Sequence, residues 1–304
     1  MENETVSIVM PCYNSEGTVA QAIRGVISQT YRPIELILVN DGSTDGSSAV
    51  IESMAESIRD AGIAFQYHIQ ENQGLGGAIE AGLQYVTGGY LAWIDSDDEL
   101  LPESVAIRVK FLQEHPDFGS VSSNAVEFIS RNGKDQLGNL VGTKVKVHSE
   151  ENQFPLMLRS QTLFCPGCHL VRTEVFRQSH GGMHIYPARH GQNFQMLLPV
   201  YYVSKHGFVN IPLYKYRVTD SSMSATTCQL EPRKFFKRQA EYKNIVRYTL
   251  KQIPGMPDKD RRHYYHGFRQ FIMEQNLDRS ISGQHSLYAL KWIVLLRLHG
   301  FFFR

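Results

Sequence analysis

Residues 6–14 read VSIVMPCYN and residues 34–41 read IELILVND, two apolar runs that each end in polar side chains. Between them, apolar residues recur at helical spacing over residues 19–27, with Ser15 available as an N-cap. Strands that alternate with helices in this way predict right-handed βαβ units, so we expect an α/β fold with a parallel sheet. The alternation continues with predicted strands at residues 63–69 and 90–94 and with predicted helices through Met54 and Ile58 and over residues 78–86.

Polar side chains follow each of the four predicted strands. The carboxyl ends of parallel strands share one edge of the sheet, and ligands bind outside that edge. We therefore expect four polar clusters to converge there. They are Tyr13-Asn14, Asn40-Asp41, Glu71-Asn72 and residues 95–98.

The segment DSDD at residues 95–98 carries three carboxylates directly after the apolar strand YLAWI. Three carboxylates this close repel one another unless a cation or water screens them. Oxygen ligands of this kind suit Mg²⁺ or Mn²⁺ that holds phosphate oxygens. The alternative is an acidic first turn of a helix that starts near Pro102.

A glycine-rich loop, ENQGLGGA at residues 71–78, opens a predicted helix, an arrangement that brings backbone N–H groups close to a phosphate. It is neither the G-x-G-x-x-G that follows the first strand in dinucleotide-binding folds nor a P-loop. Asp41 has two interpretations. It is either an ordinary helix N-cap or, at the binding edge, a carboxylate that accepts an N–H from a nucleobase.

The composition restricts the class of protein. The chain has 304 residues, of which 42% are hydrophobic and 20% charged, which excludes disordered and collagen-like classes. No run of about 18 apolar residues is present, which excludes an ordinary transmembrane helix. Four cysteines cannot form a disulfide framework, and Cys165-Pro-Gly-Cys168 lacks the second pair of a zinc site. With no secretory signal visible, we expect a cytoplasmic protein.

The second half of the chain has a mixed pattern. Helical signals dominate from residue 231 onward, in three segments broken near residues 254–257 and 283. The other predicted elements are a hairpin turn at residues 131–134 (RNGK), strands at residues 163–171 and 208–218, and a helix over residues 191–203 that Pro199 interrupts.

Four blocks in the first hundred residues resemble the family 2 inverting glycosyltransferases, which have the GT-A fold and use nucleotide-activated sugars. The blocks are residues 6–14 (VSIVMPCYN), 39–45 (VNDGSTD), 71–74 (ENQG) and 95–98 (DSDD). They occur in the family's order and spacing, which is far more specific than any single block. Weaker similarity continues over residues 167–176 and 191–224. The resemblance implies a Rossmann-like mixed, mainly parallel sheet flanked by helices, to which we add a C-terminal α-helical extension.

The resemblance also implies roles for individual residues. Pro11, Tyr13 and Asp41 would hold the nucleobase, with Asp41 accepting the uracil N–H if the donor is a UDP-sugar. Asp97 and Asp98 would be the DXD-type pair that positions the ribose and a Mn²⁺ or Mg²⁺ ion, which offsets the charge of the leaving diphosphate. The further nucleotide-sugar contacts that it implies are Asn14, Asn72, Gly74, Gly77 and Asp95.

The chain departs from the family at the general base. An inverting transfer needs a group that takes the proton of the acceptor hydroxyl, and the family supplies it from a Glu-Asp pair that opens a helix. The matching residues here are Gln192 and Asn193, and an amide cannot act as a general base at neutral pH. A relocated base, an unusual acceptor and a weak or inactive enzyme all stay open, and helix N-capping is the structural role for Asn193. We favour a relocated base; the candidates are His190, His184, Asp220 and Glu174.

The C-terminal region is strongly basic. Residues 229–304 contain fifteen Lys and Arg and six Asp and Glu, a net charge of +9, whereas the rest of the chain is acidic. This asymmetry favours an anionic partner, although a solvated helical face would look the same. No nucleic-acid module is recognisable, so we expect no nucleic-acid partner. Residues 287–304 mix Trp, Phe and Leu with Lys and Arg, which suits contact with a membrane surface or with protein, for example in a homodimer.

Together these features predict a glycosyltransferase that moves one hexose or N-acetylhexosamine, with inversion, from a UDP-sugar to a glycan or lipid-linked glycan acceptor. We expect it in the cytoplasm or peripherally on the cytosolic membrane face, in polysaccharide or glycolipid assembly. The predicted domains are residues 1–228, with a nucleotide-sugar-binding half (1–115) and an acceptor-side half (116–228), and a basic helical extension (229–304).

Three other functions were weighed. A non-catalytic nucleotide-sugar-binding or scaffold protein would explain the missing Glu-Asp pair. A nucleotidyltransferase and a dehydrogenase that uses NAD are disfavoured, because no glycine-rich loop follows the first strand. The absence of a Q-x-x-R-W motif argues against a processive synthase.

Overall fold

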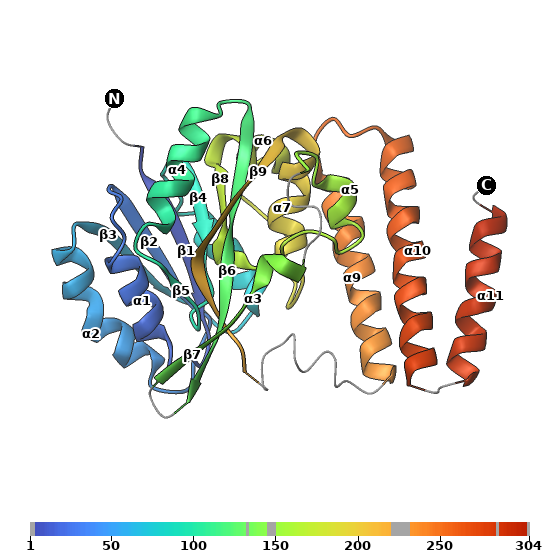
Figure 1. The fold of residues 1–304 in the computed structure, drawn as a ribbon, viewed down its shortest axis with the longest axis horizontal. Coiled ribbons are helices and arrows are strands. Elements are labelled where there is room, and N and C mark those ends of the chain that lie inside the picture. Colours follow the sequence, from blue (N-terminus) through green and yellow to red (C-terminus); the bar gives the residue numbers. More distant parts are fainter. Residues whose placement is uncertain (1–3, 132–133, 145–149, 220–231, 284–285, 303–304) are drawn as a thin grey trace.

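The computed structural model describes residues 4–131, 134–144, 150–219, 232–283 and 286–302 (Figure 1). Nine strands in these residues form one sheet, in the order β3-β2-β1-β4-β8-β6-β9-β5, with β7 paired to β6. The strands are β1 (Val6–Cys12), β2 (Ile34–Asn40), β3 (Ile63–Ile69), β4 (Tyr90–Trp93), β5 (Glu99–Leu100), β6 (Phe118–Arg131), β7 (Lys134–Leu140), β8 (His169–Arg172) and β9 (Lys205–Arg217).

Helices cover both faces of the sheet, and three long helices follow it. The helices are α1 (Val19–Ile27), α2 (Ser47–Asp60), α3 (Leu75–Leu83), α4 (Ser104–Glu114), α5 (Phe154–Met157), α6 (Thr173–His180), α7 (Gln192–Val203), α9 (Pro232–Gln252), α10 (Asp258–Ser282) and α11 (Ser286–Phe302).

The first four strands are parallel to one another, as the strand and helix alternation predicts. β1 lies between β2 and β4, with Val6 opposite Ile34 on one side and Tyr90 on the other. β2 continues the parallel ladder to β3, where Ile34 is opposite Ile63. The mixed, mainly parallel sheet flanked by helices is confirmed, and so is the C-terminal helical extension.

Alternate residues of the central strands pack into two different hydrophobic clusters. Ile8 and Met10 of β1 join the cluster that contains α1, α2 and α4. Val9 joins the cluster on the other face, which contains α3, α7, α9 and α10. A strand buried on both sides has few polar positions, and this explains why β1 and β2 read as continuous apolar runs.

The first strand continues through Pro11, although a proline lacks the N–H that a sheet ladder uses. The carbonyl of Val9 accepts the N–H of Ile94, so Val9 faces β4, and Pro11 two residues later faces the same side. β4 ends at Trp93, so no partner strand there needs the N–H that a proline lacks. β1 therefore extends to Cys12, whose carbonyl accepts the N–H of Asp41.

The second half of the sheet contains antiparallel pairs. β8 is antiparallel to both β4 and β6, and β6 with β7 forms the predicted hairpin, whose two turn residues lie outside the described residues. The strand predicted for residues 163–171 is wrong in its first part. Pro166–Cys168 form a short 3-10 helix, and only His169–Arg172 are extended, because Pro166 cannot donate to a ladder.

The C-terminal helices stand side by side at the end of the molecule away from α2 (Figure 1). Ile245, Val246 and Leu250 of α9 and Phe268 and Ile272 of α10 belong to the same hydrophobic cluster as α3 and α7. These two helices are thus continuous with the core. Among the described residues, no helix is both long enough and apolar enough to cross a membrane.

Candidate active site

The carboxylates of DSDD lie together where the chain leaves β4 and turns toward β5. One oxygen from each of Asp95, Asp97 and Asp98 lies within 4.8 Å of the others. Burial, and then the charge of Asp97, raises the pKa of Asp95 to about 7. Burial, and then the charges of Asp97 and Asp95, raises the pKa of Asp98 well above its usual value. The Arg217 guanidinium offsets the charge of Asp97 only in part, and three hard oxygen donors of this kind fit a divalent cation such as Mn²⁺ or Mg²⁺.

Strand β9 orients Asp98, which is only 2% exposed. The Tyr214 hydroxyl donates to Oδ2 (2.8 Å), and the backbone N–H of Arg217 donates to Oδ1 (2.7 Å). The alternative that these acids open the next helix is wrong. β5 follows them and pairs with β9, and α4 begins only at Ser104.

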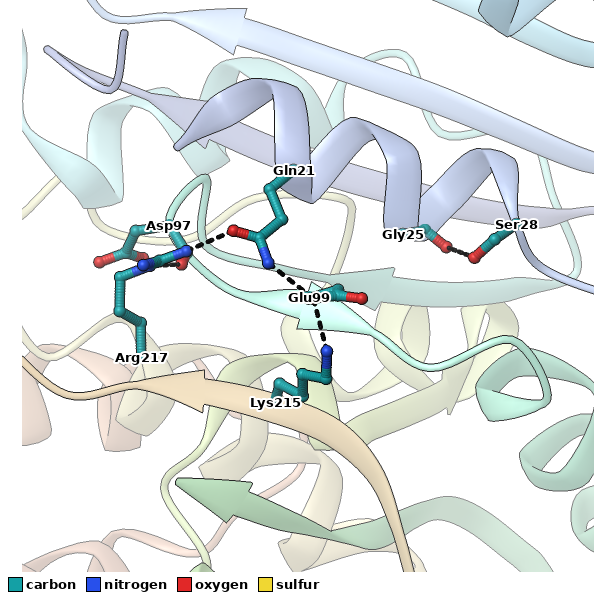
Figure 2. Close-up of polar contacts among 7 residues, drawn as sticks. All are labelled: Gln21, Gly25, Ser28, Asp97, Glu99, Lys215 and Arg217. Atoms are coloured by element: carbon teal, nitrogen blue, oxygen red, sulfur yellow. Dashed lines mark hydrogen bonds and ion pairs between the residues drawn. The ribbon is translucent and has the colours of Figure 1, made fainter. Parts of the chain in front are cut away.

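A chain of polar contacts supports the acidic turn from the side of α1 (Figure 2). Arg217 donates from Nε to the carbonyl of Asp97 (2.7 Å) and from Nη2 to Oε1 of Gln21 (2.5 Å). Gln21 in turn donates to Glu99 (2.9 Å), which also accepts from Lys215 (3.1 Å). This network connects α1, β5 and β9, so elements distant in sequence determine the position of the acidic turn.

Asp41 is buried and organises the glycine-rich loop. Its Oδ1 accepts hydrogen bonds from the Gln70 side chain (2.7 Å) and the Gln73 N–H (2.8 Å), and its Oδ2 accepts from the Gly74 N–H (2.8 Å). The Asn72 side chain donates to the carbonyl of Asp41 (3.0 Å). Asp41 does not cap α2, which begins at Ser47. The structure thus brings Asp41, Asn72 and Gly74 together.

The residues after β1 lie against the turn that follows β2. Asn14 has a φ of 48°, and its Oδ1 accepts the Thr44 N–H (2.8 Å). Tyr13 is 50% exposed, whereas Pro11 is buried within β1. Tyr13 therefore presents a surface to a ligand, whereas Pro11 does not.

Ser15 connects this region to the acidic turn instead of capping α1. Its Oγ is 2.8 Å from Oγ of Ser96, and its N–H donates to Oγ of Ser47 (2.8 Å). The N-cap position of α1 belongs to Thr18, which makes no side-chain cap hydrogen bond. The ends of β1 and β4 are thereby held together.

Residues before α7 pack on the glycine-rich loop. Gly74 has a φ of 82°, and a Cβ added there would lie 2.8 Å from Cγ of Arg189. The N–H of Gly76 donates to the carbonyl of Ala188 (3.0 Å). The N–H groups of Gln73, Gly74 and Gly76 thus have protein acceptors already, so only the remaining donors of residues 71–78, which include Gly77, are left for a diphosphate.

Gln192, Asn193 and His190 line a cavity of about 340 Å³ between the start of α7 and helices α9 and α10. Asn193 uses both ends of its amide: Oδ1 accepts from Trp93 Nε1 (3.3 Å), and Nδ2 donates to the Phe164 carbonyl (2.6 Å). The N-cap of α7 is Gly191 instead of Asn193. Asn193 therefore has a structural role, and it connects α7 to the last residue of β4.

The other candidates for the base lie elsewhere. Glu174 is in the first turn of α6 and accepts from Gln178 (2.8 Å). His184 interacts electrostatically with Glu80 of α3. Neither lines the cavity, and Asp220 lies outside the described residues.

Several residues of the site were not predicted from sequence. Tyr214 and Arg217 contact the acidic turn, Arg189 contacts the glycine-rich loop, and Glu241 of α9 lies beside His190. Their contacts depend on how β9, α7 and α9 pack against the first half. The sequence offered one indication of these residues, which is that most of them lie within or near residues 191–224, where the similarity to the family is weak.

Comparison with a family model gives a match to glycosyl transferase family 2 over residues 7–179, more than half of the chain. A Bacillus subtilis (strain 168) protein named "Putative glycosyltransferase EpsE" is 28% identical over 217 residues, which are 71% of this chain and 73% of that protein. Glycosyltransferase GlyA of Streptococcus pneumoniae serotype 4 is 29% identical over 73% of this chain, but the match spans only 32% of GlyA.

Solved structures are similar in fold. TarS residues 1–349 of S. aureus, in complex with UDP-GlcNAc, superpose with a TM-score of 0.67 at 14% identity, covering 95% of this chain and 79% of that one. The mannosyltransferase PcManGT of Pyrobaculum calidifontis, in complex with GDP-Man and Mn²⁺, has a TM-score of 0.56 at 14% identity, covering 98% and 85%. At these identities the likeness establishes a GT-A-like fold.

Proposed function

The chain belongs to glycosyltransferase family 2, whose members transfer a sugar from a nucleotide-sugar, and from that premise we propose its reaction. It moves a single hexose or N-acetylhexosamine from a UDP-sugar to a hydroxyl of a glycan or lipid-linked glycan, with inversion. The observation that supports this most is the convergence of Asp95, Asp97 and Asp98 at the strand edge that also holds Asp41 and Asn72.

In the proposed reaction, the acceptor hydroxyl attacks the anomeric carbon from the face opposite the diphosphate. The bond between that carbon and the phosphate oxygen breaks, and the nucleoside diphosphate leaves with the electron pair. A base on the acceptor side takes the hydroxyl proton.

The proposed donor contacts follow the geometry of the strand edge. Tyr13 presents an exposed ring on which the nucleobase stacks. Oδ2 of Asp41 accepts from the Gly74 N–H and has a second lone pair, which accepts the N–H of the nucleobase. Asp97 and Asp98 hold the cation and Asp95 supports them. When bound, Mn²⁺ or Mg²⁺ neutralises the charge that develops on the leaving diphosphate.

A non-catalytic nucleotide-sugar-binding protein is the alternative, because Gln192 and Asn193 replace the acidic pair. Such a protein would bind a donor and release no nucleotide. The two functions therefore differ in turnover, whereas donor binding is common to both.

The helical extension supplies the proposed partner surface. Leu287, Leu290, Val294 and Leu298 of α11 are all exposed and share one helical face, because their spacing is three, four and four residues. Such a face suits a membrane surface or a second copy of the chain. Flotation with anionic vesicles and light scattering distinguish these two partners.

The domain boundary at residue 228 stays a prediction.

The test is calorimetric titration of the full chain with UDP, UDP-GlcNAc, UDP-glucose and GDP-mannose, with and without Mn²⁺, followed by assays of nucleotide release. We expect binding that depends on Mn²⁺, a loss of affinity of about tenfold or more in Asp97→Asn, and slow release of nucleotide by the wild type. Asp60→Asn, at the exposed end of α2, is the matched control.

Binding without release in the presence of an acceptor panel would favour the non-catalytic alternative. Donor binding that is equally tight in Asp97→Asn and without metal would contradict the role of the acidic turn. Failure to bind any of these donors would contradict the proposed donor class.

A further inference from the structure

The cavity at the start of α7 is lined in part by the helical extension. One side consists of residues 190–194, and the other side comes from α9 and α10. The α9 and α10 residues that line it are Arg238, Gln239, Tyr242, Phe268, Phe271, Ile272 and Gln275. Aromatic side chains with amides and a guanidinium among them suit a sugar ring, which has apolar faces and polar edges.

His190 lies between two residues that are tied to the donor side. Arg189 reaches Oδ1 of Asn72 (3.5 Å) and packs on Gly74. Asn193 bonds to Trp93, two residues before Asp95. His190 therefore lines the cavity within a segment that Arg189 and Asn193 connect to the donor side.

The His190 ring has one nitrogen available for proton exchange. Nδ1 is enclosed by protein and makes no hydrogen bond of standard geometry with the described residues, although the Arg189 backbone interacts with the ring and raises its pKa. Nε2 lies 3.7 Å from Oε2 of Glu241, on α9. Both side chains are partly exposed, and His190 lines the cavity, so a ligand there has access to its ring.

We propose that His190 is the general base of this transferase and that Glu241, supplied by the helical extension, is its positioning residue. As the acceptor oxygen attacks the anomeric carbon and the diphosphate leaves, the hydroxyl proton moves to Nε2 of His190. The Glu241 carboxylate then stabilises the imidazolium that forms. This assignment rests on the proposed function and supplies the base that Gln192 and Asn193 lack.

The charges around His190 favour the neutral ring that a base requires. Burial lowers the pKa of His190 below 6.5, and the cations of Arg238 and Arg189 lower it further, whereas Glu241 raises it. The phenol of Tyr242 is the remaining titratable group that lines the cavity. At pH 7 the ring is mostly neutral, and in the tautomer that carries its proton on Nδ1 the Nε2 lone pair can accept a proton.

The experiment compares His190→Gln and Glu241→Gln with the wild type, as full chains with Mn²⁺. Nucleotide release from UDP-GlcNAc, UDP-glucose and GDP-mannose is followed with water and with p-nitrophenyl glycosides as acceptors, and donor affinity is measured by calorimetry. His263→Gln and Glu274→Gln, both on α10 and outside the cavity lining, are the matched controls.

We expect His190→Gln to lower kcat by about 10²–10⁴-fold, with donor affinity within about twofold of the wild type. Glu241→Gln should lower kcat by about tenfold or more and move the acidic limb of the pH profile to lower pH. The sign follows because the carboxylate raises the pKa of His190, so its removal lowers that pKa. A purely structural role for Glu241 would lower kcat and leave the limb in place.

Unchanged turnover in His190→Gln, with donor binding intact, would overturn the assignment of the base and leave the proposed function standing. An unmoved acidic limb in Glu241→Gln would overturn the positioning role. Donor binding by the wild type without release to any acceptor would overturn both the base and the transfer reaction.

Discussion

The resemblance to the family predicts a general-base carboxylate at residues 192–193, and the contacts of Asn193 explain why an amide fits there. The Phe164 carbonyl requires a donor, which Nδ2 supplies at 2.6 Å, and Trp93 Nε1 requires an acceptor, which Oδ1 supplies at 3.3 Å. A carboxylate offers two acceptors and no donor. Asn193 therefore supports the packing of α7 through these two hydrogen bonds.

The first prediction concerns this residue. Asn193→Asp places a carboxylate oxygen against the Phe164 carbonyl, so we expect the free energy of unfolding to fall by about 1–3 kcal/mol and kcat not to rise. Urea unfolding and nucleotide release measure the two effects. Asn193→Ala, which loses the bonds without adding repulsion, is the control. Wild-type stability with faster turnover in Asn193→Asp would show that a base fits here after all.

Helix α7 shows compensation at the scale of an element. Pro199 lies inside α7 and cannot donate to the carbonyl of Gln195 four residues earlier. That carbonyl instead accepts from Nε2 of His180 on α6 (2.7 Å), and both residues are nearly fully buried. The helix therefore tolerates its proline because a neighbouring helix supplies the missing donor.

The second prediction is a coupling between these two positions. His180→Phe leaves the Gln195 carbonyl without a donor, which costs about 1–3 kcal/mol, whereas Pro199→Ala restores a backbone N–H. We expect His180→Phe to cost less in the Pro199→Ala background, with a coupling of about 1 kcal/mol in urea unfolding. Ser179→Ala, which touches only Nδ1 of His180, should show no coupling to Pro199→Ala.

The third prediction contrasts two glycines in helices. A Cβ at Gly76, in the first turn of α3, would collide with the carbonyl oxygen of Ala188, so Gly76→Ala should cost about 1–3 kcal/mol and weaken donor binding. Gly267 in α10 has no atom of another element within 4 Å. Gly267→Ala should therefore stabilise the protein by about 0.5–1 kcal/mol. We expect thermal unfolding to show a lower Tm for Gly76→Ala and a higher Tm for Gly267→Ala. Equal changes in Tm would contradict the close packing at Gly76.

At the scale of the whole molecule, three histidines of the described residues are buried, and burial favours their neutral form. Burial lowers the pKa of His169 to about 3 and that of His180 to about 4, and it lowers the pKa of His206 well below its usual value. His206 lies between the hydroxyls of Ser120 and Ser122, each 2.9 Å away. The three residues belong to β8, α6 and β9, so the acid sensitivity is a property of the assembled core.

The fourth prediction is a loss of stability in acid. Because the folded-state pKa values lie below the unfolded value of about 6.5, the unfolded chain takes up protons first as the pH falls. The folded state therefore has its full stability with respect to these histidines above pH 6.5, and it loses stability as the pH falls toward 4 and 3. Each histidine contributes up to about 1.4 kcal/mol per pH unit to the slope.

Urea unfolding between pH 7 and 5 measures this slope, and a His206→Asn variant should have a slope smaller by that amount. Comparing slopes removes the opposite contribution of Asp95. Its raised pKa of about 7 stabilises the folded state as the pH falls through that value. Equal slopes for the two proteins would show that His206 titrates alike in both states.

The sequence by itself determined the α/β class and the strand edge that carries the site. Apolar runs such as residues 34–39 can only be buried on both faces of a sheet, and parallel strands must place their polar ends together. It also predicted that the three carboxylates lie near one another, because they fall within four residues directly after a buried strand. The three C-terminal helices likewise followed from local periodicity.

Only the tertiary structure decided which groups surround those acids. The short segment β5, the contacts of Tyr214 and Arg217 with the acidic turn, and the approach of Glu241 to His190 all join residues about a hundred positions or fifty positions apart. Such contacts depend on how elements pack, and neither propensity nor periodicity encodes a partner at that separation. The sequence alone predicted that the family's base is missing, whereas the packing of α9 against α7 brings Glu241 to His190, the pair that we propose in its place.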